Sequence, residues 1–172
     1  MAIYPCVDYT ELKPNQKENF NFQKVSALLA DHGFMTLRVS SDWESADFIA
    51  QHVDGVRFLK VQLKSRFTID RKYCGKDLHI CFPDRAWGRT WDRNLRTWYL
   101  CPHDKLMDRA LKSTKIGNRK GWLSSGTANA KKPPPEIRLF LENYVLGPDG
   151  HPNSPTCGHL KFPHPERGVT MG

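Results

Sequence analysis

Three residues in two adjacent segments have types and spacing that suit metal-dependent chemistry. Asp47 lies inside the otherwise apolar segment 46–53, where a carboxylate needs a cation, a hydrogen bond or a strand edge to offset burial. Gln62 and Lys64 are two residues apart in the next segment, so in a strand their side chains point to the same face. Carboxylate and amide oxygens bind hard cations such as Mg²⁺, and a nearby ammonium stabilises developing negative charge or positions a water. The alternative is that the face with Gln62 and Lys64 is simply the solvent-exposed face of an antiparallel sheet.

Glu18 is the fourth candidate for this site. It precedes Phe22, Val25 and Leu29 by four, seven and eleven residues, which are close to whole turns of a helix. It therefore falls at the end of the core-facing stripe, where the helix meets the rim of the sheet. Its alternative role is that of an acidic residue favoured near a helix N-terminus by the helix dipole.

A helix, three strands and a hairpin are expected to position these residues. The periodicity predicts the helix over 15–32, the strands over 34–40, 46–53 and 57–67, and a hairpin over 67–82. Asp54-Gly55 is a hairpin signal between the second and third strands, which makes Asp47 a neighbour of Gln62 and Lys64. The arms of the later hairpin are 67–73 and 78–82, with its turn at 75–77.

The second half of the chain is expected to add one strand and two helices. The strand covers 97–100, and the helices cover 103–113 and 136–146, the last one begun by a run of prolines. Residues 114–132 hold several glycines and no apolar period, which predicts a loop. The expected fold is α/β (α+β), with a central mixed β-sheet flanked by helices in the order α-β-β-β-(β-hairpin)-α-α. We expect one domain over 1–146 and a Gly/Pro-rich arm over 147–172.

The charge pattern favours a polyanionic partner. The net charge is +8, and residues 111–133 hold six basic residues and no acidic one. Arginines and lysines contact phosphates, and tryptophans stack on bases. The alternatives are tryptophans packed in the core and basic residues that only solubilise their loops. The candidate nucleic-acid contacts are Arg66, Arg85, Trp87, Arg89, Arg93, Lys115, Arg119 and Lys120.

Several classes of protein are excluded or disfavoured. No apolar run reaches the roughly 18–20 residues that span a bilayer, and the first residues lack the features of a signal peptide, so we expect an intracellular protein without a membrane partner. The five cysteines form no C-x-x-C pair, which argues against a disulfide framework and a conventional zinc site. The spacing of Cys157, His159 and His164 is poor for a metal. No nucleophile elbow or comparable hydrolase motif occurs.

The order of a helix Glu, a strand Asp and a strand Gln-x-Lys resembles the PD-(D/E)xK nuclease superfamily. That superfamily includes many type II restriction enzymes, Holliday-junction resolvases and some homing endonucleases. The resemblance covers roughly residues 13–146 and implies a restriction-endonuclease-like α-β-β-β-α-β core, which the expected elements match through about residue 113. It implies that Asp47 is the metal-binding aspartate, Lys64 the superfamily's lysine and Glu18 its auxiliary acid. Gln62 stands where Asp or Glu is usual, and Ala46 replaces the Pro of the motif.

The resemblance implies a metal-dependent endonuclease that hydrolyses phosphodiester bonds in DNA. Asp47 and Gln62, with Glu18 in support, would bind Mg²⁺, with Mn²⁺ a possible substitute, and Lys64 would assist the attack of water. The partner is expected to be double-stranded DNA, and a homodimer would supply the two sites that cut both strands. Gln62 brings no negative charge, so metal affinity should fall.

Two alternatives stay open, and the neutral Gln62 side chain favours the first. The first is a catalytically inactive nucleic-acid-binding module on the same fold. The second is a basic structural or regulatory protein without a nucleic-acid role, which predicts that Asp47 forms a salt bridge, for example with Lys64.

Overall fold

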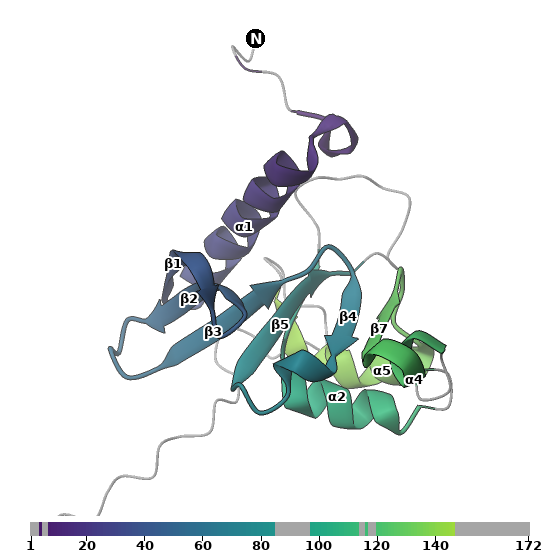
Figure 1. Cartoon of the computed structure of the whole chain (residues 1–172). Helices are drawn as coiled ribbons and strands as arrows, with labels where there is room; N and C mark the ends of the chain where they lie inside the picture. The colour runs from purple at the N-terminus through teal and green to yellow at the C-terminus, as the bar shows by residue number, and fades with distance from the viewer. Residues whose placement is uncertain (1–3, 5–6, 85–96, 114–115, 117–119, 147–172) are drawn as a thin grey trace, which may run out of the picture.

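A six-stranded β-sheet with helices on both faces organises the chain (Figure 1). The computed structural model describes residues 4, 7–84, 97–113, 116 and 120–146. The strand order is β1 (Phe34–Trp43), β2 (Ala46–His52), β3 (Phe58–Leu63), β5 (Leu78–Pro83), β6 (Trp98–Pro102) and β8 (Val145–Leu146). Among the neighbouring strands that the structure describes, only β3 and β5 pair in parallel, so the sheet is mixed, as expected.

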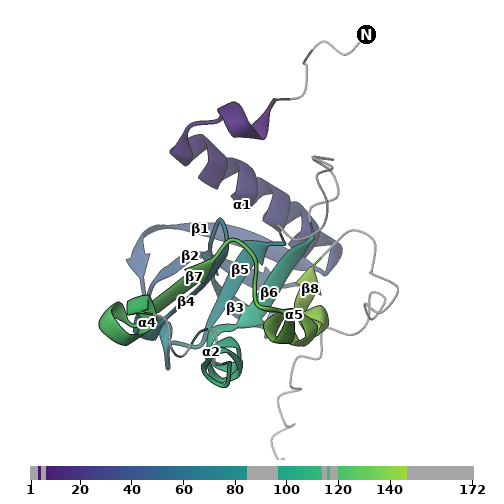
Figure 2. The same cartoon turned by 90° about the vertical axis from the view of Figure 1, so that its right-hand side faces the viewer.

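The two faces of the sheet are covered by different elements (Figure 2). One face carries α1 (Pro14–Asp31). The other carries three helices and a separate two-stranded ribbon, which are α2 (His103–Leu111), α4 (Lys120–Ser125), α5 (Pro135–Leu141), β4 (Phe67–Asp70) and β7 (Thr127–Ala130). This arrangement confirms the expected mixed sheet flanked by helices. Three 3₁₀ turns complete the described elements: η1 (Tyr9–Glu11), η2 (Arg71–Tyr73) and η3 (Glu142–Tyr144).

Helix α1 forms where its sequence signals predict it. Pro14 occupies the first turn, where its missing N–H costs no helix hydrogen bond. The helix ends before Gly33, which adopts φ +78° and accepts the left-handed backbone that other residues avoid. Val25 and Leu29 are fully buried against Phe48 and its neighbours in the sheet. The apolar stripe of α1 therefore forms one of the two cores.

The β2–β3 hairpin is confirmed and fixes the register of the candidate site. Gly55 adopts φ +71° in the turn, and the Asp54 carboxylate accepts hydrogen bonds from the amides of Val56 and Arg57 at 3.0 and 3.1 Å. The strands then pair antiparallel from Gln51–Phe58 to Phe48–Val61. The expected third strand was too long, since β3 ends at Leu63 and not at residue 67.

The expected hairpin over 67–82 is wrong. Strand β4 leaves the main sheet and pairs antiparallel with β7, while β5 inserts between β3 and β6. The side chains of β5 are almost all buried, on both faces of the sheet, because it is a central strand. Its nearly continuous apolar sequence is typical of such a strand and not of a hairpin arm with one solvent-exposed face.

The expected loop over 114–132 is also wrong, because it contains α4 and β7. Trp122 of α4 and Ala128 of β7 are buried in the core on the α2 side of the sheet. The Arg71 guanidinium lies 4.6 Å from the centroid of the Trp122 ring. Two apolar side chains at these positions order a segment whose composition is mostly polar.

The last expected helix ends early. Helix α5 stops at Leu141, and the 3₁₀ turn η3 leads into β8, which pairs with β6. Leu146 is almost fully buried there, so pairing at the sheet edge replaces the final helical turn. The proposed arm over 147–172 lies outside the described residues. Within the described part of the chain, no helix is long and apolar enough to cross a membrane.

Candidate active site

Asp47 lies where β2 and β3 separate. The last paired residues of the hairpin are Phe48 and Val61. Beyond them, one carboxylate oxygen of Asp47 accepts hydrogen bonds from the backbone N–H of Leu63, at 2.7 Å, and from the side-chain amide of Gln62. The Asp47 side chain thus takes the place of a backbone carbonyl in the ladder. This exchange holds its carboxylate at a fixed position between the two strands.

On its other edge, β3 stays paired with β5 beyond the point where its pairing with β2 ends. Leu63 still pairs with Cys81 of β5, and the N–H of Lys64 donates to the Cys81 carbonyl at 2.7 Å. The backbone of the Gln-x-Lys segment is therefore anchored on the β5 side while its β2 side opens around Asp47. The predicted proximity of Asp47 to Gln62 is confirmed, and their hydrogen bond shows that both side chains extend to the same side of the sheet.

Two oxygens at this position receive no hydrogen bond from the described residues. The donors to Asp47 both reach Oδ2, and within the described part of the chain none reaches Oδ1. Gln62 is only 8% exposed, and it uses its Nε2 for Asp47. Among the described residues, its Oε1 also lacks a donor. A carboxylate oxygen and an amide oxygen left in this way are the donor set that Mg²⁺ prefers.

The electrostatics of Asp47 are those of a carboxylate partly removed from water. Burial raises the pKa of Asp47 above its ordinary value. The Leu63 amide, the Lys64 ammonium and the Gln62 amide act in the opposite direction, and the Glu18 charge adds to the increase. The net direction is upward, so the available donors and the lysine do not fully compensate the buried charge. A bound cation would complete that compensation.

Lys64 is near this carboxylate without forming an ion pair with it. Its Nζ lies 5.3 Å from the centroid of the Tyr73 ring, which faces it from η2. Within the part of the chain that the structure describes, no ion pair of 4.0 Å or less joins Lys64 to Asp47. The ring holds the ammonium beside the site through a cation–π contact. Sequence reasoning did not identify Tyr73, because its approach to Lys64 depends on the path of β4 and η2.

Glu18 is less buried than its helical position predicts. Its side chain is 63% exposed and pairs at 2.7 Å with Arg38 of β1, and the Arg38 guanidinium lies 4.9 Å from the Phe22 ring centroid. The expectation of a core-facing Glu18 is therefore wrong, although the residue does meet the rim of the sheet. Its charge still acts on Asp47, so Glu18 lies in the surroundings of the site and not in direct contact with it.

The candidate nucleic-acid contacts fall largely outside the described residues. Arg66 is exposed just beyond β3, on the segment that carries Lys64. Lys120 begins α4. The candidates that lie outside the described residues are Arg85, Trp87, Arg89, Arg93, Lys115 and Arg119.

No protein-family model, curated protein or solved structure matches this chain. The resemblance to the nuclease superfamily therefore depends on the motif and on the geometry of the described residues.

Proposed function

We propose that this chain is a Mg²⁺-dependent endonuclease that hydrolyses phosphodiester bonds in DNA. The observation that carries the proposal is the position of Asp47 beside Gln62 at the divergence of β2 and β3, with Lys64 nearby. The three residues come from the two arms of one hairpin and lie where its ladder of hydrogen bonds ends. The absence of an ion pair between Asp47 and Lys64 in the described part of the chain also disfavours a purely structural salt bridge.

The arrangement of α1 and the first strands supports a restriction-endonuclease-like core. In that family core a helix precedes three strands, the acid lies on the second strand and the lysine follows on the third. Here α1 precedes an antiparallel β1–β2–β3 unit, with Asp47 on β2 and Lys64 just beyond β3. The departure comes after β3, since β4, β5 and β6 all precede α2.

Each residue has a distinct role in the proposed reaction. Asp47 Oδ1 and Gln62 Oε1 would hold the cation, with Glu18 adding negative charge from a distance. The chemistry supplied by a bound Mg²⁺ is a lower pKa for a coordinated water and partial neutralisation of the phosphate charge. Lys64 would orient the attacking water or stabilise the additional negative charge that develops on the phosphate. Tyr73 keeps the Lys64 ammonium in place for this role.

The decisive experiment measures cleavage of plasmid and single-stranded DNA with Mg²⁺, with Mn²⁺ and with a chelator. We expect cleavage only with metal, and a decrease of roughly 100- to 1,000-fold in rate for Lys64→Ala, the usual cost of losing one group that stabilises the transition state. Asp47→Asn should lose metal-dependent activity as well.

Lys72→Ala is the matched control for Lys64→Ala. The Lys72 ammonium also lies over the Tyr73 ring, 5.0 Å from its centroid, but Lys72 does not act on Asp47. Both variants lose a cation–π contact with the same ring, but only Lys64→Ala should show the decrease of roughly 100- to 1,000-fold in cleavage rate. A rate for Lys64→Ala close to that of the unmodified chain, or cleavage in the presence of chelator, would refute the proposal.

A second candidate function is a nucleic-acid-binding module without catalysis, favoured by the neutral side chain of Gln62. It predicts DNA binding that weakens with added salt, together with no cleavage under any metal condition. The same samples therefore distinguish the two functions when binding and cleavage are both measured.

A further inference from the structure

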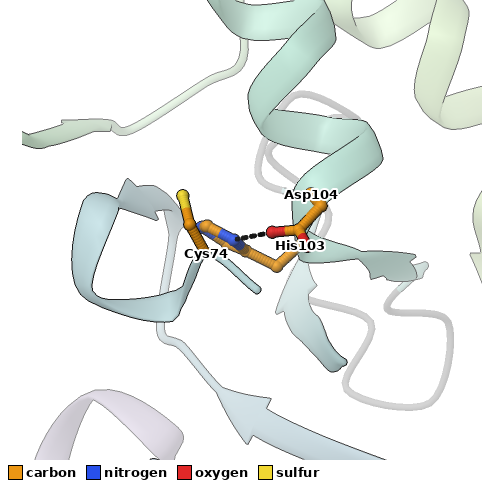
Figure 3. A group of neighbouring side chains, drawn as sticks. All are labelled: Cys74, His103 and Asp104. Carbon is orange, nitrogen blue, oxygen red and sulfur yellow. Dashed lines mark hydrogen bonds and ion pairs between the residues drawn. The ribbon is translucent and has the colours of Figure 1, made fainter. Parts of the chain in front are cut away.

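A second group of potential metal ligands lies where the end of η2 meets the start of α2. It consists of Cys74, which follows η2, and His103 and Asp104, which begin α2 (Figure 3). One potential ligand atom from each residue lies within 4.8 Å of the other two. These residues come from distant segments, so their convergence follows from the tertiary fold and not from a local turn.

The imidazole of His103 is fixed and presents one nitrogen to the cluster. The side chain is only 1% exposed, and the ring packs edge-on against Tyr73 with centroids 5.5 Å apart. Its Nδ1 lies 3.4 Å from a carboxylate oxygen of Asp104. Donors in a tetrahedral zinc shell lie roughly 3.3–3.8 Å apart, as the usual bond lengths require. The His103–Asp104 pair therefore already has the spacing of two zinc ligands.

The carboxylate of Asp104 is oriented by a neighbouring backbone group. Both of its oxygens accept the N–H of Gly75, at 3.1 and 3.2 Å. Hydrogen bonds of this kind orient the carboxylates that bind metals. They also fix the 74–75 segment next to the carboxylate, which keeps the exposed Cys74 thiol beside the other two donors.

The local charge favours a cation even though the chain as a whole is basic. The carboxylates of Asp104, Asp108 and Asp70 lie close enough to act electrostatically on Cys74, and Arg71 opposes them. Three carboxylates around one thiol attract a divalent cation.

We propose that Cys74, His103 and Asp104 form a zinc-binding site. Thiolate, imidazole and carboxylate are the usual zinc ligands, and the thiolate selects zinc over Mg²⁺. Three protein ligands leave a fourth position for a water or another small ligand. Binding through Nδ1 places the ring proton on Nε2. Two described contacts are then lost: the hydrogen bond between Nδ1 and Asp104, which the two bonds to the metal replace, and the 3.4 Å hydrogen bond that Nε2 accepts from the Asp70 amide.

Bound zinc would also stabilise the neighbourhood of Lys64. It would join the end of η2 to the start of α2, and the Tyr73 ring lies between His103 and the Lys64 ammonium. The zinc site is nevertheless independent of the proposed nuclease function, because none of its ligands contacts Asp47 or Gln62 within the described part of the chain.

The test is zinc binding by the purified, chelator-treated full chain, measured by competition with a chromophoric chelator. We expect one Zn²⁺ per chain, and Co²⁺ in its place should show thiolate-to-metal charge-transfer absorption. Cys74→Ser should weaken zinc binding by at least about 100-fold and abolish the charge-transfer absorption, and Asp104→Asn should weaken binding by about 10- to 100-fold. Asp104 is exposed and its substitution is conservative, so this variant tests the site even if Cys74→Ser folds poorly.

Two further variants serve as controls. Cys157→Ser removes a different thiol and Asp47→Asn removes the proposed magnesium ligand, and both should bind Zn²⁺ as tightly as the unmodified chain. No zinc binding by the unmodified chain would overturn the proposal. It would also be overturned if Cys74→Ser and Asp104→Asn bound zinc as tightly as the unmodified chain, or if Asp47→Asn lost zinc binding. Each of these results would place the metal elsewhere. All of these readouts are separate from nuclease activity, so the two proposals fail independently.

Discussion

Gln62 donates its side-chain amide to the same Asp47 oxygen that accepts the backbone N–H of Leu63. The hydrogen bond bridges the point at which β2 and β3 separate. It leaves the other Asp47 oxygen and the Gln62 carbonyl as the free acceptors of the pair among the described residues. The site is therefore organised before any cation binds, and a carboxylate with a raised pKa remains only partly compensated.

The first prediction concerns the pH dependence of stability. Because the pKa of folded Asp47 lies above its ordinary value of 3.8, the folded chain holds this proton more tightly than the unfolded chain. Stability is therefore lost as pH rises from about 4 through the folded pKa, and the full penalty remains at neutral pH. Asp47→Asn keeps the shape and removes the charge. It should be more stable than the unmodified chain at pH 7, by about 1.4 kcal/mol per unit of pKa increase.

Urea unfolding of both chains between pH 4 and 8, without metal, measures this difference. The advantage of Asp47→Asn should shrink as the pH falls, and a difference that is independent of pH would contradict the explanation. Asp54→Asn is a control of opposite sign. Burial acts to raise the pKa of Asp54, but hydrogen bonds from Arg57, Val56 and His52 outweigh it and lower the pKa. This variant should lose stability throughout the range from pH 4 to 8, and the loss should shrink only when the pH falls below the ordinary pKa of 3.8.

The elements with strong local signals could be predicted from the sequence. Pro14 and Gly33 mark the ends of α1, and Asp54-Gly55 marks the turn between β2 and β3. Those signals were sufficient to bring Asp47 next to Gln62, because a hairpin register depends only on its turn and on the alternation of its strands. The contact between Asp47 and Gln62, which depends on this register, was therefore predictable.

The remainder depends on contacts between distant segments, for which a single sequence has no local signal. The pairing of β4 with β7 joins Asp70 to Thr127, which are 57 positions apart. The placement of Tyr73 against Lys64 and the approach of Cys74 to His103 follow from that pairing and from the docking of α2. A composition rich in glycine and lysine concealed α4 and β7, which the buried side chains of Trp122 and Ala128 order.

The second prediction concerns the turn between α4 and β7. Gly126 adopts φ +72°, and a Cβ there would lie 2.7 Å from the Cδ of Arg71. Gly126→Ala should therefore combine backbone strain of about 1–2 kcal/mol with displacement of the Arg71 side chain from the Trp122 ring. The lost cation–π contact adds about 0.5–1 kcal/mol. Thermal or urea unfolding measures the sum.

Gly55→Ala isolates the backbone part of that effect. Gly55 has nearly the same φ, +71°, but no atom lies within 4 Å of the position of its Cβ. It should therefore show the backbone strain alone, and Gly126→Ala should be the less stable of the two. Equal losses would mean that the contact between Arg71 and Trp122 contributes nothing to stability.

The third prediction tests the weakest proposed metal ligand. Gln62→Glu places a second carboxylate against Asp47, and two such groups repel and raise each other's pKa. Without metal the variant should lose on the order of 1 kcal/mol or more of stability at neutral pH. With Mn²⁺ or Mg²⁺ the added charge should increase metal affinity by about tenfold or more, since nearby opposite charges interact strongly when partly shielded from water. Urea unfolding with and without metal should therefore show a much larger stabilisation by metal in Gln62→Glu than in the unmodified chain.

Gln51→Glu is the matched control for this substitution. Gln51 lies on the same strand as Asp47 and on the same face, but it is opposite Phe58 and four residues from the carboxylate. It adds the same charge to the same face of the sheet, so any general effect of charge on stability appears in both variants. A metal-dependent gain confined to Gln62→Glu would assign the cation to the Asp47–Gln62 pair. If metal stabilised both variants equally, or neither, the pair would not be the cation site, because the added carboxylate would then have no cation to bind.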